Sequence, residues 1–304
     1  MSVVKLNTLL PVLCCLIAAI MWGIFWYPLR ILEQKGMPGL WATLVIYMSA
    51  LMSLLPVLLA KRHGHVKQSG LLLLMGLFSG WTNLSFILAI LEGTVVRVLL
   101  LFYLSPVWAT LLACFFLHEH LSLKAWVSLL MALSGAVFIL WSDEIGVMTQ
   151  VDVADVLAIS SGFAFAVTNV LVRKADQVPI HMKMLSAWVG VICLSLTGIV
   201  IVQPPSPVMS LDAFALAILL GSFGMLAMTW LTQYGVTHLP VHRSAILFEF
   251  EVVAGAVSAA LLTREVVTLR EWIGGIIVML AAWIIARDSI KQEETGNDSY
   301  QNET

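Results

Sequence analysis

Long apolar stretches alternate with short polar joints along most of the chain. Dividing it at charged residues, Pro and Gly gives ten stretches, each near the length of about 20 residues that a helix needs to cross a bilayer. They cover residues 9–32, 38–60, 69–91, 95–117, 122–141, 154–173, 182–203, 212–236, 240–262 and 270–287. Every backbone polar group must be satisfied within lipid, and the alternating pattern of barrel strands is absent. We therefore predict an all-α membrane protein with ten transmembrane helices.

Composition supports this prediction. Of the 304 residues, 60% are hydrophobic and 11% are charged, whereas a soluble domain carries about 25% charged residues. The four cysteines all lie in apolar stretches without the spacing of metal ligands, so we interpret them as packing residues. The first apolar stretch lacks a small-residue cleavage pattern, and many more stretches follow it. We interpret it as a retained helix and not as a signal peptide.

Lys and Arg predict the orientation of the chain. With the N-terminus in the cytoplasm, the inner segments carry Lys5, Lys61, Arg62, Lys67, Lys124, Arg173, Lys174, Lys183, Arg243, Arg287 and Lys291. The outer segments carry Arg30, Lys35, Arg97, Arg264 and Arg270. Because cytoplasmic loops are enriched in these residues, we predict that both termini are cytoplasmic. The polar, acidic residues 288–304 are predicted to form a disordered cytoplasmic tail.

The chain contains an internal duplication. Shifted by 146 positions, residues 95–130 align with residues 241–276 without a gap. The matched residues that are scarce in this composition are Arg97 with Arg243, Glu119 with Glu265, and Trp126 with Trp272. We therefore predict two repeats of five helices each, at 1–146 and 147–287.

An odd number of spans per repeat inverts the second repeat relative to the first. The two repeats would then be related by a two-fold axis in the plane of the membrane. Inverted repeats are a recurrent architecture of secondary transporters, in which the substrate site lies near the midplane between the repeats. The duplication therefore predicts a central cavity and a transport function.

The same segments carry a family resemblance. The stretch "LSPVWATLLACFFLHEHLSLKAWVSLLMALSGAVFIL" contains a proline within the helix, Pro106, and an acid at the helix end, Glu119. The second repeat ends likewise at Glu265, and "MWGIFWYPLR" opens the first. Over about residues 9–287 the chain resembles EamA-type members of the drug/metabolite transporter superfamily. It departs from the pattern at Val252, which stands where the first repeat has Pro106.

The resemblance implies a secondary transporter for a small metabolite, without a cofactor. The superfamily handles amino acids, nucleotide sugars, quaternary amines and drugs. We predict that the protein exports an amino acid or a related compound. The alternative prediction is transport of cationic amines or drugs. The compact chain with short loops predicts a multi-pass protein of the bacterial inner membrane, whose partners are the lipid bilayer, a small-molecule substrate and, as a coupling ion, the proton.

Two acids lie within the ninth apolar stretch, where a charged side chain costs about 2.5 kcal/mol or more on insertion scales. At helical spacing, Glu251 shares a small and polar face with Ser244, Phe248 and Gly255. It lies about 15 Å from the start of the stretch, near the midplane, whereas Glu249 points about 160° away around the helix. We predict that Glu251 faces the cavity and takes up a proton or a cationic substrate group. The alternative, an acid held neutral by hydrogen bonds between helices, is favoured for Glu249.

Other residues at similar depth are candidates for lining the cavity, since aromatic walls suit a cationic amine. They are Trp22, Trp26, Trp81, Asn83, Tyr103, Asn169, Trp230, Gln233 and Phe248. Packing, interhelical hydrogen bonds and aromatic belts explain such residues equally well. Structural or gating roles are predicted for Pro28, Arg97, Pro106, Glu119, Arg243 and Glu265. The pair Gly76 and Gly80 predicts a close helix contact.

Other functions have weaker support. No ATP-binding motif, nucleophile–base pair or nucleic-acid-binding pattern is present in the sequence. The pattern "HEH" at 118–120 lacks a third ligand nearby, so we predict no metal site. An intramembrane enzyme acting on lipid would depend on His118 and His120. A channel is a further alternative.

Overall fold

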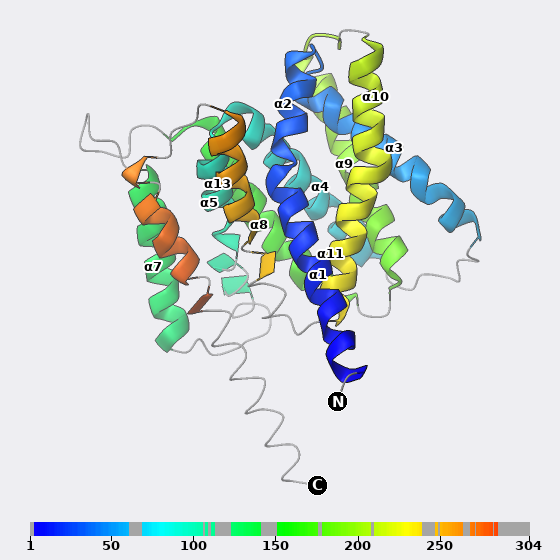
Figure 1. The fold of residues 1–304 in the computed structure, drawn as a ribbon. Coiled ribbons are helices and arrows are strands. Elements are labelled where there is room, and N and C mark those ends of the chain that lie inside the picture. Colours follow the sequence, from blue (N-terminus) through cyan, green and yellow to red (C-terminus); the bar gives the residue numbers. More distant parts are fainter. Residues whose placement is uncertain are drawn as a thin grey trace.

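The structure is a computed structural model that describes most of the apolar stretches. The described residues are 3–60, 69–105, 107–108, 111–112, 123–140, 151–175, 178–207, 210–238, 247–248, 250–263, 268–270, 272–281 and 283–284. The elements are α1 (Val3–Ile24), α2 (Trp26–Gln34), α3 (Gly39–Ala60), α4 (Ser69–Glu92), α5 (Val95–Phe102), α7 (Leu123–Leu140), α8 (Val153–Lys174), α9 (Ile180–Val202), α10 (Leu211–Leu219), the π-helix η1 (Leu220–Met225), α11 (Leu226–His238) and α13 (Phe250–Leu262). In these residues the fold is all-helical, as predicted (Figure 1).

Six of the described helical segments are long and apolar enough to cross a membrane. They are Leu10–Gln34, Gly39–Leu59, Ser69–Glu92, Val153–Val172, Ile180–Val202 and Leu211–Thr232. Shorter apolar helices span Trp126–Gly135, Phe250–Leu262 and Trp272–Ala281. All of them lie at predicted spans, and Phe250–Leu262 covers only the second part of the predicted span 240–262. The total of ten spans and the cytoplasmic position of the termini stay predictions.

Two predicted spans are interrupted within the apolar stretch, and in the sequence a proline follows each interruption. The helix α1 ends at Ile24 and α5 ends at Phe102, each four residues before a proline, Pro28 and Pro106. Proline has no N–H to donate to the carbonyl four residues earlier, so the helical ladder is interrupted there. Within the span predicted over residues 95–117, the helix α5 therefore ends at Phe102 and a turn follows at Tyr103 and Leu104.

Packing takes place mainly between the halves of the chain. The helix α4 lies against α8 and α9, α1 against α11 and α13, α3 against α9 and η1, and α5 against α8 and α13. Exchanging α1 with α8, α3 with α9, α4 with α10–α11, and the fourth predicted span (with α5) with the ninth (with α13) returns these contacts between the halves. For example, α4–α8 becomes α11–α1, and α5–α8 becomes α13–α1. This is the pattern expected of two halves related by a two-fold axis.

The directions of the helices agree with inversion of the second half. The side chain of Lys35, in the turn between α2 and α3, forms an ion pair with Asp212 at the start of α10. Consequently α3 leads away from this end of the bundle, while its equivalent α9 leads towards it (Figure 1). The limits 1–146 and 147–287 and the disordered tail 288–304 stay predictions.

The contact between α4 and α9 depends on glycines that have no room for a side chain. A Cβ at Gly80 would lie 2.6 Å from the carbonyl carbon of Gly190, and a Cβ at Gly190 would overlap the backbone of Gly76. Small residues let the two backbones approach closely in lipid. The predicted close-contact face of Gly76 and Gly80 is thus confirmed, and α9 is its partner.

Adding one methyl group at this contact should destabilise the protein. We expect Gly190→Ala to lower the free energy of unfolding by about 1–3 kcal/mol, because the methyl group overpacks a backbone contact. Gly70→Ala is the matched control, since a Cβ at Gly70 meets nothing within 4 Å, and alanine favours the helix by about 1 kcal/mol. Thermal unfolding in detergent measures both variants. An equal gain of stability in both would contradict the contact.

Candidate functional site

The buried acid Glu251 lies in the first turn of α13, between α1 and α5. It is 8% exposed. On one side, α1 approaches so closely that a Cβ at Gly23 would lie 2.7 Å from the Cβ of Ala254 and 2.9 Å from the backbone nitrogen of Gly255. Small residues on both helices therefore bring α1 against the turn that carries Glu251.

On the other side of Glu251, Tyr103 at the end of α5 provides a hydrogen-bond donor. Its hydroxyl oxygen lies 3.1 Å from Oε2 of Glu251 and 2.5 Å from the carbonyl oxygen of Phe248. A tyrosine has one hydroxyl proton, so it donates to one of these two acceptors at a time. When Glu251 is ionised, its carboxylate competes for that proton. When Glu251 is protonated, it can donate a hydrogen bond to the hydroxyl oxygen of Tyr103, while that hydroxyl donates to the carbonyl oxygen of Phe248.

This acid has no basic partner within the part of the chain that the structure describes. The ion pairs in these described residues join Lys35 to Asp212 and Arg97 to Asp155. A carboxylate removed from water without a countercharge is costly. Glu251 is therefore stabilised by carrying a proton or by meeting a cation that these described residues do not supply.

Both proline-associated breaks lie next to Glu251. The helix α1 ends one residue after Gly23, and a Cβ there would meet the carbonyl oxygen of Glu251. The helix α5 ends one residue before Tyr103, which contacts the carboxyl group. Discontinuous helices at membrane depth expose backbone groups to substrates and ions in transporters. The arrangement thus places a titratable group between two interrupted helices of the other half.

Of the predicted tryptophans, Trp26 contacts α13 directly. Its Nε1 donates to Oγ of Ser258, 2.9 Å away, two turns beyond Glu251. The guanidinium carbon of Arg30 lies 5.3 Å from the ring centroid. Trp26 is 1% exposed. Its edge and one face are therefore occupied by partners from its own chain. Trp22 donates instead to Thr232 of α11, at 3.3 Å.

Asn83 belongs to a separate contact. Its side-chain oxygen accepts a hydrogen bond from the hydroxyl of Tyr47 at 2.6 Å, and its amide donates to the carbonyl of Ser79 at 2.8 Å. These bonds tie α3 to α4. The side chain of Asn83 therefore has structural partners, which is the alternative that the sequence left open.

Three other predicted residues are exposed. Trp81 is 40% exposed, and its Nε1 donates to Ser160 of α8 at 3.2 Å. Trp230 is 54% exposed and stacks on Tyr234 with 5.3 Å between the ring centroids. Asn169 lies exposed on α8. The structure brings Glu251, Tyr103 and Phe248 together, with Trp26 close by, and does not bring these three into the same contact.

Several predicted residues lie outside the described part of the chain, so their roles stay predictions. They are Pro106, Glu119, Arg243, Glu249 and Glu265, together with the side chain of Gln233. The histidines His118 and His120 also lie outside it. Within the described residues no group of three side chains could hold a metal ion.

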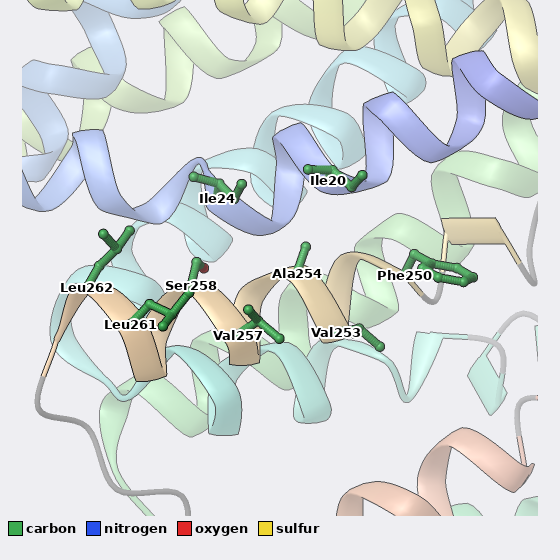
Figure 2. A pocket seen from close by; sticks show the side chains of 9 residues that line it. All are labelled: Ile20, Ile24, Phe250, Val253, Ala254, Val257, Ser258, Leu261 and Leu262. Carbon is green, nitrogen blue, oxygen red and sulfur yellow. The ribbon is translucent and has the colours of Figure 1, made fainter.

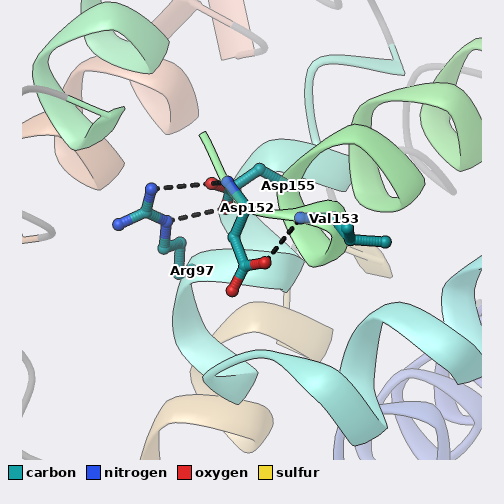
Figure 3. Close-up of polar contacts among 4 residues, drawn as sticks. All are labelled: Arg97, Asp152, Val153 and Asp155. Atoms are coloured by element: carbon teal, nitrogen blue, oxygen red, sulfur yellow. Dashed lines mark hydrogen bonds and ion pairs between the residues drawn. The ribbon is translucent and has the colours of Figure 1, made fainter. Parts of the chain in front are cut away.

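Sequence reasoning missed the partner of Arg97. Its Nε donates to Oδ1 of Asp155 and its Nη2 to Oδ2, both at 2.7 Å (Figure 3). Asp155 also accepts from the backbone N–H of Asp152, at 2.9 Å, in the capping box that starts α8. An acid three residues after Asp152, ahead of an apolar run, is a recognisable capping signal. Nothing local in the sequence pairs it with Arg97.

A separate apolar groove of about 460 Å³ runs between α1 and α13 (Figure 2). Its walls include the exposed side chains of Ile20, Ile24, Val253 and Val257, and Ser258 is its one hydroxyl-bearing residue. Glu251 does not line it. Exposed apolar side chains on two membrane helices suit contact with hydrocarbon. We therefore do not assign the polar site to this groove.

These features define a multi-pass helical membrane protein built from a duplicated unit, with a buried acid between interrupted helices. The chain belongs to the EamA-like transporter family, which matches it twice, at residues 9–141 and 152–287. Membership places it in the drug/metabolite transporter superfamily, as the resemblance implied, and the two matches confirm the duplication.

Comparison with solved structures supports the fold alone. Among 26 solved chains that match, one described as "Crystal structure of protein" superposes with a TM-score of 0.59 at 17% identity. The match covers 93% of this chain and 98% of the other. A search of curated proteins found no match.

The bond between Tyr103 and Glu251 can be tested by a double-mutant cycle. We expect Tyr103→Phe and Glu251→Ala to be coupled by about 0.5–3 kcal/mol in the free energy of unfolding, since each removes one partner of the same contact. Tyr47→Phe combined with Glu251→Ala is the control, because Tyr47 bonds to Asn83 instead. Denaturation in mixed micelles gives the four stabilities of each cycle. Additivity for Tyr103 and Glu251 would contradict the bond.

Proposed function

We propose that this protein is a secondary transporter that exports an amino acid or a related small metabolite across the bacterial inner membrane by alternating access. Membership of the EamA-like transporter family supports the transport function. The contacts between exchangeable halves support alternating access, because two similar halves can close either end of a shared path.

The observation that carries the coupling proposal is the contact of Glu251 with Tyr103. Since α5 belongs to the first half and α13 to the second, this hydrogen bond joins the halves beside both helix breaks. Loss or gain of a proton on Glu251 changes which group Tyr103 serves as donor. A proton or a substrate cation at Glu251 therefore alters the contact between the halves.

Mutually exclusive occupancy of Glu251 would produce antiport. An amino acid brings an ammonium group that can replace a proton as the partner of the carboxylate. If the acid carries either the proton or the substrate in each half-cycle, proton entry drives substrate exit. No ATP-binding motif is present in the sequence, so the gradient supplies the free energy.

Aromatic side chains near Tyr103 favour a second substrate class, cationic amines or drugs. The rings of Phe102 and Tyr103 lie 5.7 Å apart, and those of Trp26 and Tyr27 lie 5.5 Å apart. Such rings attract a quaternary ammonium group through cation–π contact. Arg30 already occupies one face of Trp26, which is why we rank amines second. A lipid-modifying enzyme or a channel finds no support in the family match.

Replacing the acid by its neutral isostere should separate coupling from binding. In proteoliposomes with an imposed pH gradient and a panel of amino acids and quaternary amines, we expect wild-type protein to show saturable, gradient-driven transport. Glu251→Gln should reduce it to the level of empty liposomes, while counterflow of the same substrate persists, because exchange needs no net proton movement.

The matched control is Glu249→Gln, two residues away in the same apolar stretch, which is predicted to point to another face. It should keep gradient-driven transport. Loss of both transport and counterflow in Glu251→Gln would assign this residue to substrate binding instead of coupling. Activity equal to the wild type would refute a role for Glu251.

A further inference from the structure

We propose that the ion pairs Arg97–Asp155 and Lys35–Asp212 form an ionic latch that closes one end of the transport path and opens in every cycle. The inference rests on the proposed transport function. Both pairs join the first half of the chain to the second: α5 to α8, and the α2–α3 turn to α10. Any motion that separates the halves at this end must break them.

The two pairs lie at the same end of the bundle. In the middle of α2, Nη2 of Arg30 donates to the carbonyl of Gly93, 2.7 Å away, and to that of Ile90 at 3.3 Å. Gly93 lies in the joint between α4 and α5, four residues before Arg97. Arg30 therefore connects α2, which ends next to Lys35, with the joint that precedes Arg97. The two ion pairs lie at the same end of the bundle for this reason.

The pair Arg97–Asp155, called the inner pair because it is the more buried of the two, has the stronger geometry. Arg97 binds Asp155 through two hydrogen bonds of 2.7 Å, a geometry that is stronger than a single contact. The side chain of Asp155 is 2% exposed and that of Arg97 is 25% exposed. Asp155 is further fixed by the backbone N–H of Asp152 (Figure 3). Separation would leave a buried charge without its partner unless water enters.

The pair Lys35–Asp212, called the outer pair, is weaker and more accessible to water. Lys35 is 39% exposed and Asp212 is 62% exposed, and such surface pairs contribute little to stability. Water reaches this pair first. The order of exposure suits a latch in which the outer pair loosens before water reaches the inner pair.

The latch has an equivalent basic residue but no equivalent acid at the opposite end. Exchange of the halves carries Arg97 onto Arg243 and the start of α8 onto the start of α1. Residues 1–32 contain no Asp or Glu, so α1 offers no counterpart of Asp155. Within the residues that the structure describes, this ionic closure lies at one end of the bundle. It favours the state that is closed at this end and open at the other, which the distribution of Lys and Arg predicts to be the cytoplasmic end.

Thiol accessibility tests the latch without any substrate. In a background without Cys14, Cys15, Cys114 and Cys193, Ala158→Cys places a reporter three residues beyond Asp155 on α8, at a fully buried position. A membrane-impermeant thiol reagent is added to both faces of vesicles. We expect Arg97→Gln to raise the rate of modification about ten-fold, since loss of a buried pair shifts the two-state equilibrium.

Lys35→Gln should raise that rate about two-fold, because the pair is exposed. We expect this exposed substitution to leave the fold intact, so it keeps the test valid if Arg97→Gln fails to fold. Glu33→Gln is the control, an exposed charge at the same end that belongs to neither pair. Rates unchanged by both Arg97→Gln and Lys35→Gln would overturn the latch and identify the pairs as static fold contacts.

Locking the outer pair is the complementary experiment. Lys35→Cys with Asp212→Cys, joined by a short cleavable thiol crosslinker, should abolish counterflow and the modification of Ala158→Cys, and reduction should restore both. Glu33→Cys with Glu92→Cys is the control, because these carboxyl groups repel each other within the first half. Modification that responds to the lock without any transport would refute the proposed function and retain the gate. Transport that survives the lock would refute the latch.

Discussion

In lipid, every backbone carbonyl needs a donor, and the site follows from two places where the helical donor is missing. Pro28 and Pro106 cannot donate to the carbonyls of Ile24 and Phe102, and α1 and α5 end at those residues. The interruption of α5 places the Tyr103 hydroxyl beside the carbonyl of Phe248 and the carboxyl of Glu251. The acid is thus held beside the points where helices of the other half are interrupted.

The two halves share a packing plan but have diverged in chemistry. Their contacts survive exchange of equivalent helices, which requires small residues at the crossings, such as Gly23 against α13 and Gly190 against α4. At the centre, however, the first half supplies proline and tyrosine, while the second supplies Val252 and Glu251. The shared plan therefore explains why equivalent helices exchange contacts, and the divergence at the centre explains why Glu251 has Ser105 and not an acid at the aligned position of the first half.

Charge is likewise distributed unequally between the ends. The described ion pairs between the halves lie at the end where α3, α5, α8 and α10 begin. A gate made of ion pairs differs physically from one made of packed apolar side chains, because water and salt weaken the former more than the latter. The same fold can therefore bias its resting state without changing its helix packing.

The sequence by itself determined the helical class, most span positions, the duplication and Glu251 as the prominent buried acid, because these depend on hydropathy, spacing and scarce residues. It also marked both prolines. The tertiary structure decided which side chains meet. From the sequence, Trp26, Asn83 and Trp81 were all candidates for lining the cavity. In the structure their hydrogen-bond partners are Ser258, Tyr47 and Ser160, respectively. Asp155 joined Arg97 over a separation of 58 residues. Helical periodicity fixes the face on which a residue lies, but the neighbour of that face is set by long-range packing.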